Sequence, residues 1–131
     1  MLKTLLLVGA SVVLAGCSTS KCINVLYQPG ESNTAEIGGG TFGHHAKISE
    51  LMVNQQKDGH YRAQANIANL TDENQYLRYR ISWLNAQGQP AGYYTPWKSL
   101  QLYPELNEVV AAVSPNKEAN NFSVQVCQDK Q

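Results

Sequence analysis

The sequence predicts an all-β protein, specifically an immunoglobulin-like antiparallel β-sandwich of seven to eight short strands. Three observations support this class. Turn-forming residues recur about every eight to twelve positions beyond residue 45. The segments between these turns alternate apolar with polar side chains, as half-buried strands do. Beyond residue 17, no segment carries apolar residues at the helical period of about 3.6. The length of 131 residues is enough for one ordinary domain.

The clearest strand pattern covers residues 76–85, where apolar side chains alternate with Arg78 and Arg80. Trp83 ends this apolar series and is expected to fill the core between the two sheets. In residues 47–56 the alternation is imperfect, and Pro96 interrupts the strand expected at residues 93–103. The predicted strands are residues 22–27, 47–56, 61–70, 76–85, 93–103, 108–113 and 122–127.

The connecting segments are predicted from their turn residues. Residues 28–45 are rich in Gly, Ser, Asn and Thr, which indicates a long irregular loop. Asn69-Leu70-Thr71 and Asn121-Phe122-Ser123 both match a glycosylation sequon. Asn and Thr side chains also bond the backbone of turns, and we interpret both segments as turn chemistry.

The amino terminus has the features of a bacterial export signal. Lys3 is followed by an apolar run at residues 5–14, and at about ten residues this run is too short to span a bilayer. The tetrad Leu14-Ala15-Gly16-Cys17 closely resembles the lipobox of bacterial lipoproteins. Residues 1–16 are therefore expected to be a lipoprotein signal peptide, with Cys17 carrying diacylglycerol. An ordinary cleaved signal with a chance cysteine is the alternative.

The residue after the cysteine bears on location. Ser18 stands where an Asp would resemble a retention signal of the inner membrane. We therefore expect the protein at the periplasmic face of the outer membrane. The membrane is then a partner through the lipid anchor.

Two further cysteines, Cys22 and Cys127, form an even pair for an oxidising compartment. One disulfide is expected, and two free thiols are the alternative. Residues 17–21 are then a lipidated cysteine with a short tether, and residues 22–131 form the domain. If Cys22 is bonded to the last strand, the four tether residues after Cys17 reach at most about 14 Å.

Charge and residue patterns argue against several function classes. Ten basic residues balance ten acidic ones, which leaves no electrostatic footprint for nucleic acid. The histidines, His44, His45 and His60, lack the partners that a metal site needs at ligand spacing. Glu105 and Glu108 flank a turn, where solvation is the usual role. We therefore expect no enzyme activity, no cofactor, no metal and no small-molecule ligand.

The most distinctive surface candidate is the segment that contains Tyr93, Tyr94 and Trp97. Adjacent residues on a strand face opposite ways, so the two tyrosines cannot both be buried, and Pro96 places the segment at an edge or a bulge. Exposed Tyr and Trp suit stacking on a glycan or docking of a partner protein. The alternative is that Trp97 and one tyrosine cover the core.

The segment from Asn69 to Thr71, together with residues 76–88, resembles a pattern of the YcfL-like family. These are small periplasmic lipoproteins of Gram-negative bacteria, and the resemblance covers residues 46–127. Asn85 departs from the pattern, in which Asp is common. The resemblance implies two sandwich strands with their turns and no established activity. Members of that family tend to be encoded near lipoproteins that activate peptidoglycan synthases. Two functions are open, an interaction module for an envelope protein assembly and a glycan-binding domain that uses the Tyr93–Trp97 aromatics. A structural lipoprotein with no dedicated ligand is a third alternative.

Overall fold

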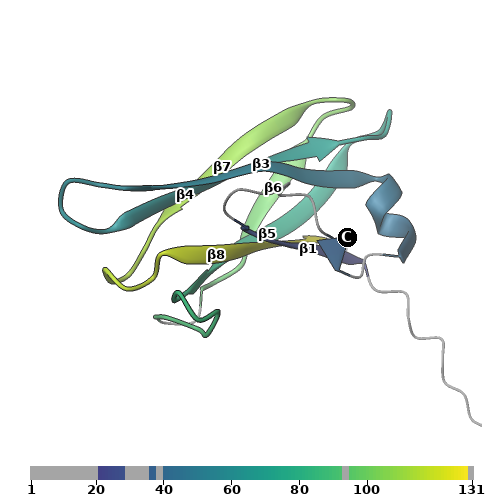
Figure 1. Ribbon diagram of the computed structural model, residues 1–131. Coiled ribbons are helices and arrows are strands. Elements are labelled where there is room, and N and C mark those ends of the chain that lie inside the picture. Colours follow the sequence, from purple (N-terminus) through teal and green to yellow (C-terminus); the bar gives the residue numbers. More distant parts are fainter. Residues whose placement is uncertain (1–20, 29–35, 38–39, 93–94, 130–131) are drawn as a thin grey trace, which may run out of the picture.

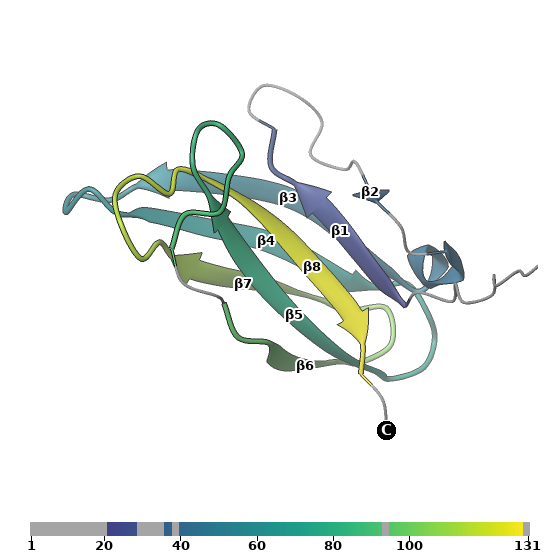
Figure 2. The same cartoon turned by 90° about the horizontal axis from the view of Figure 1, so that it is seen from below.

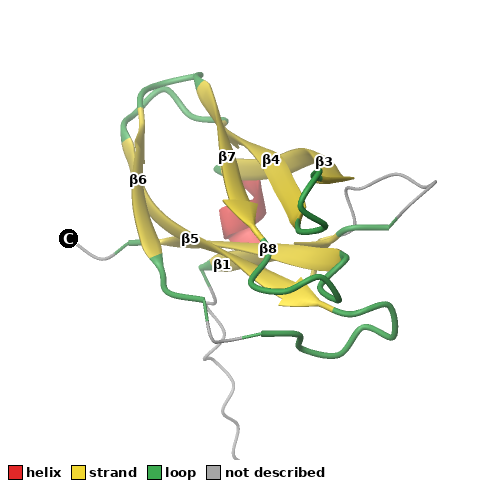
Figure 3. Cartoon of the chain, turned by 90° about the vertical axis from the view of Figure 1, so that its left-hand side faces the viewer, coloured by secondary structure: helices red, strands yellow, loops and turns green. Residues whose placement is uncertain are grey.

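Two antiparallel sheets pack face to face in the computed structural model, which describes residues 21–28, 36–37, 40–92 and 95–129 (Figures 1 and 3). The predicted all-β sandwich is confirmed. The strands of the described residues are β1 (Cys22–Leu26), β2 (Glu36–Ile37), β3 (Ala46–Gln55), β4 (Tyr61–Asn69), β5 (Gln75–Leu84), β6 (Lys98–Leu102), β7 (Asn107–Val113) and β8 (Asn121–Gln128).

The strand order explains how the amino terminus joins the fold. One sheet has the order β2-β1-β8-β5-β6 and the other has the order β3-β4-β7. Strands β5, β8 and β1 correspond to the C-F-G order of an immunoglobulin-like sheet. The place of the usual last strand is therefore taken by the first strand of this chain. Figure 2 shows β1 lying alongside β8, and Cys22 pairs directly with Cys127 in this register.

The core lies between the sheets and is centred on Phe122 of β8. Its ring stacks on Tyr27 at a centroid distance of 5.3 Å and meets Trp83 at 5.9 Å. Trp83 is buried, as the sequence predicted. In the other sheet, the small residues Ala63 and Ala65 of β4 are fully buried. Aromatic rings on one sheet and small side chains on the other let the two layers interdigitate.

The imperfect alternation in β3 is caused by a bulge. The register with β4 shifts between Ser49 and Met52, and Glu50 has a positive φ of 55°. The extra residue reverses the alternation, so Ile48 and Leu51 both point into the core although they are three positions apart.

The expectation that residues 28–45 form an irregular loop throughout is wrong in part. Within this segment the structure contains β2 and a 3-10 helix at Gly40–His44, called η2. Phe42 of η2 is buried in the core cluster. Removal of its apolar ring from water favours the ordered helical turn that carries it. Among the described residues, no helix is long and apolar enough to cross a membrane.

Asn69 joins the two loops at one end of the sandwich. Its Nδ2 group donates to the carbonyl oxygens of Glu73 (2.8 Å), Leu102 (3.0 Å) and Tyr103 (3.1 Å). Its Oδ1 atom accepts from the backbone nitrogen and the hydroxyl of Thr71, at 2.9 and 2.7 Å. The amide of Asn69 is thus fully used inside the fold, which agrees with turn chemistry.

Substitution Asn69→Ala is expected to lower the free energy of unfolding by about 2–3 kcal/mol, because three carbonyl groups lose their donor and the bond to Leu102 is buried. Urea denaturation followed by circular dichroism measures this. Asn74→Ala is the control, since Asn74 is exposed in the same loop. Equal stabilities of the two variants would contradict the role given to Asn69.

Candidate functional site

Trp97 lies on the outward face of the five-stranded sheet. It directly precedes β6 and is half-buried. Its ring centroid is 4.8 Å from the guanidinium carbon of Arg78 and 4.4 Å from that of Arg80. Alternation along β5 sends Leu77 inward and both arginines outward. The alternative that Trp97 covers the core is therefore wrong.

Gly92 fixes the backbone conformation of the β5–β6 connection at a point before Trp97. Gly92 has a positive φ of 124°, and a Cβ atom there would collide with the ring of Pro115. Only glycine combines this conformation with this close approach. The strand expected at residues 93–103 is shortened to β6, because Pro96 cannot donate to a ladder. Tyr93 and Tyr94, the other two candidate residues, lie outside the described residues.

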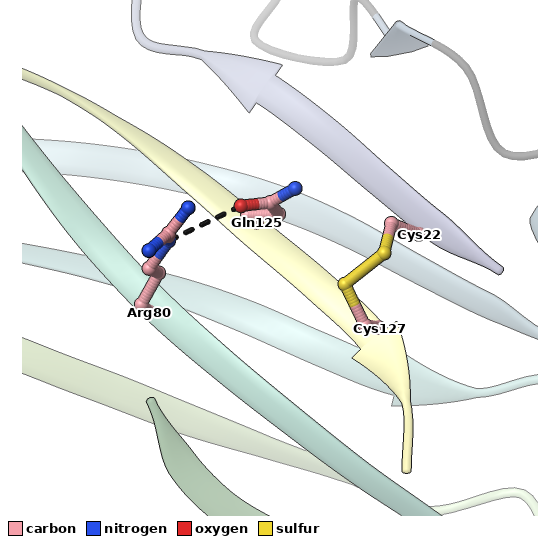
Figure 4. The surroundings of a disulfide bond; sticks show 4 residues. All are labelled: Cys22, Arg80, Gln125 and Cys127. Carbon is pink, nitrogen blue, oxygen red and sulfur yellow. Dashed lines mark hydrogen bonds between the residues drawn. A yellow bond between two sulfur atoms is a disulfide. The ribbon is translucent and has the colours of Figure 1, made fainter. Parts of the chain in front are cut away.

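A neutral polar side chain contacts Arg80 on this face. The Nε group of Arg80 donates to Oε1 of Gln125 at 3.2 Å, and the register places Asn24 beside Gln125 in the next strand. Figure 4 shows Arg80 and Gln125 on the same side of the sheet as the disulfide. Among the described strands β1, β5, β6 and β8, none of the outward positions holds Asp or Glu.

We call this surface the arginine–tryptophan face and define it by Asn24, Arg78, Arg80, Trp97 and Gln125. Cation–π contacts hold the guanidinium groups against the indole ring, which limits the freedom of three long side chains. Planar guanidinium groups recognise carboxylates with two parallel hydrogen bonds. A face that presents two arginines suits a ligand that carries acidic groups.

The predicted disulfide is present on this same face. The sulfur atoms of Cys22 and Cys127 are 2.07 Å apart, and the two residues are neighbours in the β1–β8 ladder. Arg78 is the next residue across the sheet from Cys127. The bond thus joins the amino-terminal strand to the strand that supports the arginine–tryptophan face. Cys17 lies outside the described residues.

The other titratable residues are dispersed over the fold. His44 is in η2 and His45 follows it, whereas His60 follows the β3–β4 turn, with Nδ1 at 2.9 Å from the carbonyl oxygen of Ser114. Glu105 lies in the β6–β7 turn with a positive φ of 61°. Across the described part of the chain, no group of three His, Cys, Asp or Glu residues is placed to hold a metal ion.

Tyr79 has a perturbed titration. Burial raises the pKa of its phenol above 10.0, and the nearby carboxylate of Glu108 raises it further. Glu108 lies in β7, close to the start of the strand that the sequence predicted at residues 108–113. The folded protein therefore keeps a proton that the unfolded chain releases near pH 10. The stability linked to Tyr79 is complete below that pH and is lost as the pH rises through the folded-state pKa.

Tyr79→Phe should move the midpoint of alkaline unfolding to higher pH, since Phe has no proton to release. Circular dichroism during an alkaline titration measures this midpoint. Tyr103→Phe is the matched control, because Tyr103 is exposed and lies outside the core cluster. Identical midpoints for the native protein and Tyr79→Phe would contradict the linkage.

Arg78 and Arg80 were not among the candidate site residues predicted from the sequence. Their pattern indicated only the polar side of a strand. A pair of arginines two positions apart places both side chains on one face of a strand, which is a readable signal. Their contact with Trp97 could not be predicted from the sequence, because Trp97 belongs to a different segment from β5.

Comparison with known proteins places the chain among relatives. It resembles the crystal structure of a DUF1425 family member from Shewanella sp. pv-4, with a TM-score of 0.60, 21% identity, and coverage of 93% of this chain and 99% of that one. It also resembles Campylobacter jejuni cj0090, with a TM-score of 0.54, 11% identity, and coverage of 63% and 85%. At these identities both likenesses concern the fold alone.

Sequence comparison identifies the family. No curated protein matches the chain. The sequence profile described as protein of unknown function (DUF1425) matches residues 34–128, which is most of the chain. The protein therefore belongs to the DUF1425 family.

Proposed function

We propose that this protein is a lipoprotein anchored at the periplasmic face of the outer membrane, where it acts as a non-enzymatic interaction module for a cell-envelope protein assembly. Two observations support the anchor and the location. The tetrad at Leu14–Cys17 resembles a lipobox, and residues 46–127 resemble the YcfL-like lipoproteins. The Cys22–Cys127 disulfide is consistent with an oxidising compartment.

The arginine–tryptophan face is the observation that carries the binding role. Trp and Arg are the side chains that most often dominate the energy of protein interfaces. Here their mutual contacts hold them in place before any partner arrives, so less side-chain entropy is lost on binding. The partner surface should be acidic, because Arg78 and Arg80 place two positive charges on one face and guanidinium groups recognise carboxylates.

A glycan is the second candidate ligand, with peptidoglycan or a surface polysaccharide as its source. Trp97 shares its face of the sheet with the amides of Asn24 and Gln125, which favours this candidate, since aromatic rings and amides together bind sugars. However, two guanidinium groups already lie within 4.8 Å of the indole centroid. They compete for the ring surface on which a sugar would stack. The protein partner is therefore the better supported ligand.

Site-specific photo-crosslinking in the native host tests the protein partner. The crosslinking residue replaces Gln101, which is exposed and points outward from β6. A control at Gln64 samples the outward face of the three-stranded sheet. We expect a protein adduct from Gln101 that is lost in Trp97→Ala and in Arg78→Glu, and none from Gln64. Adducts of equal yield from both faces would refute the proposal.

Two further measurements address the anchor and the glycan. The intact mass of the mature protein from its host should correspond to a chain that begins at an acylated Cys17. Sedimentation of the lipid-free domain with purified cell-wall sacculi tests the glycan candidate. A domain that stays in the supernatant excludes peptidoglycan as the ligand. Sedimentation that is abolished by Trp97→Ala would favour peptidoglycan over a protein.

A further inference from the structure

Exposed apolar side chains gather at one end of the sandwich. Tyr103 and Leu106 of the β6–β7 turn are 56% and 54% exposed, Leu70 of the β4–β5 loop is 49% exposed, and Tyr76 at the start of β5 is 41% exposed. These four are the majority of the seven large apolar side chains that are exposed among the described residues. Such a concentration on a small domain indicates a contact surface.

The two loops that carry Leu70, Tyr103 and Leu106 are joined by backbone hydrogen bonds. The backbone nitrogen of Asn69 donates to the carbonyl oxygen of Leu106 at 2.8 Å, and that of Glu105 donates to Thr71 at 3.1 Å. The buried amide of Asn69 adds its bonds to Leu102 and Tyr103. We call this surface the apolar end and define it by Leu70, Tyr76, Tyr103 and Leu106.

The chain enters the domain at this same end. The carbonyl oxygen of Lys21 accepts from the backbone nitrogen of Gln128 at 2.8 Å, and the next residue, Cys22, is held by the disulfide. The nitrogen of Asp129 donates to Tyr76 at 2.8 Å, so β1, β8 and β5 meet here. Figures 1 and 2 show the start of β1, the end of β8 and both loops at one end of the molecule.

We propose that the apolar end rests on the lipid surface to which Cys17 anchors the protein. This inference depends on the lipid anchor of the proposed function. Only four residues separate Cys17 from Cys22, and a span of about 14 Å cannot hold the domain away from the bilayer. The end of the domain nearest the anchor must then face lipid, and Tyr and Leu side chains are stable at that interface.

The charges at this end set the depth of the contact. Asp72 and Glu73 line a shallow polar depression with His45 and Gln128, and Glu105 lies in the β6–β7 turn. These carboxylates stay hydrated, so only the tips of the four apolar side chains enter the interface. Acidic groups also repel anionic headgroups, and neutral lipids should be preferred. The arginine–tryptophan face then points sideways, free to meet a partner.

Fluorescence quenching by lipid tests this orientation. The full lipidated chain carries Trp97→Phe to remove the half-buried indole of the outward face, while Trp83 in the core serves as a constant background. A probe is introduced as Leu106→Trp, and the matched control is Val113→Trp near the opposite end, since these residues are 54% and 52% exposed. Each variant is placed in phosphatidylcholine vesicles with bromine-labelled acyl chains, and in unlabelled vesicles.

The expected result is a loss of at least about twofold in the probe fluorescence of the Leu106→Trp variant, with no loss in that of the Val113→Trp variant. Equal quenching of both probes, or quenching of neither, overturns the inference and leaves the anchor intact. The intact mass of the same samples separates the two proposals. If that mass shows residue 17 unmodified, the anchor and the orientation are both wrong.

Discussion

Trp83→Ala should lower the free energy of unfolding by about 3–5 kcal/mol, which is a large part of the total stability of a small domain. The indole is only 7% exposed and meets Phe122, which in turn stacks on Tyr27. Alanine leaves a cavity between two sheets whose strands are fixed by their ladders, so the walls cannot collapse to fill it. We expect the substitution to unfold the domain or to bring it close to unfolding.

The second tryptophan provides the control. Trp97→Ala removes an indole of the same size from the outward face, where the ring contacts guanidinium groups rather than the core. Its cost should be about 1 kcal/mol, the worth of exposed cation–π contacts. Thermal and urea denaturation of both variants measure the difference. Trp83→Ala with an unchanged melting curve would show that the core is not organised around this residue.

Sequence patterns predicted the parts of the fold that depend on period-2 alternation. Strands β4, β5 and β8 lie within about a residue of the expected segments, and Trp83 is buried as expected. Local sequence patterns did not predict the features that depend on contacts between residues distant in sequence or on an irregular strand. Phe42 is surrounded by Gly and Thr residues, which indicate a loop, yet the open end of the sandwich buries its ring. The bulge at Glu50 reverses the alternation of β3, which a fixed period cannot describe.

The candidate site was predictable only in part, for a related reason. Trp97 was identified from its residue type and from Pro96 beside it. Its location on the outer face depends on the turn at Gly92, whose close contact with Pro115 joins segments distant in sequence. Likewise, the spacing of Arg78 and Arg80 gives their shared face, but nothing local to β5 shows that an indole from another segment covers them.

Replacement of both bonded cysteines, Cys22→Ala with Cys127→Ala, should lower the free energy of unfolding by about 2–4 kcal/mol. The bond closes a loop with a sequence separation of 105, which spans nearly the whole domain, and its loss enlarges the unfolded ensemble. Denaturation with and without a reducing agent measures the effect. The reductant should weaken the native protein to the level of the double variant and leave that variant unchanged.

The same double variant tests what the disulfide does for β1. This strand has only five residues, and its outer neighbour β2 has two, so β1 depends on its pairing with β8. Without the covalent bond, the backbone amides of β1 should exchange with solvent faster than those of the β5–β8 ladder. If the anchor is as proposed, β1 also transmits any pull from the lipid to the domain. Uniform exchange over β1 and β5 in the double variant would show that hydrogen bonds and core packing alone hold the amino-terminal strand in place.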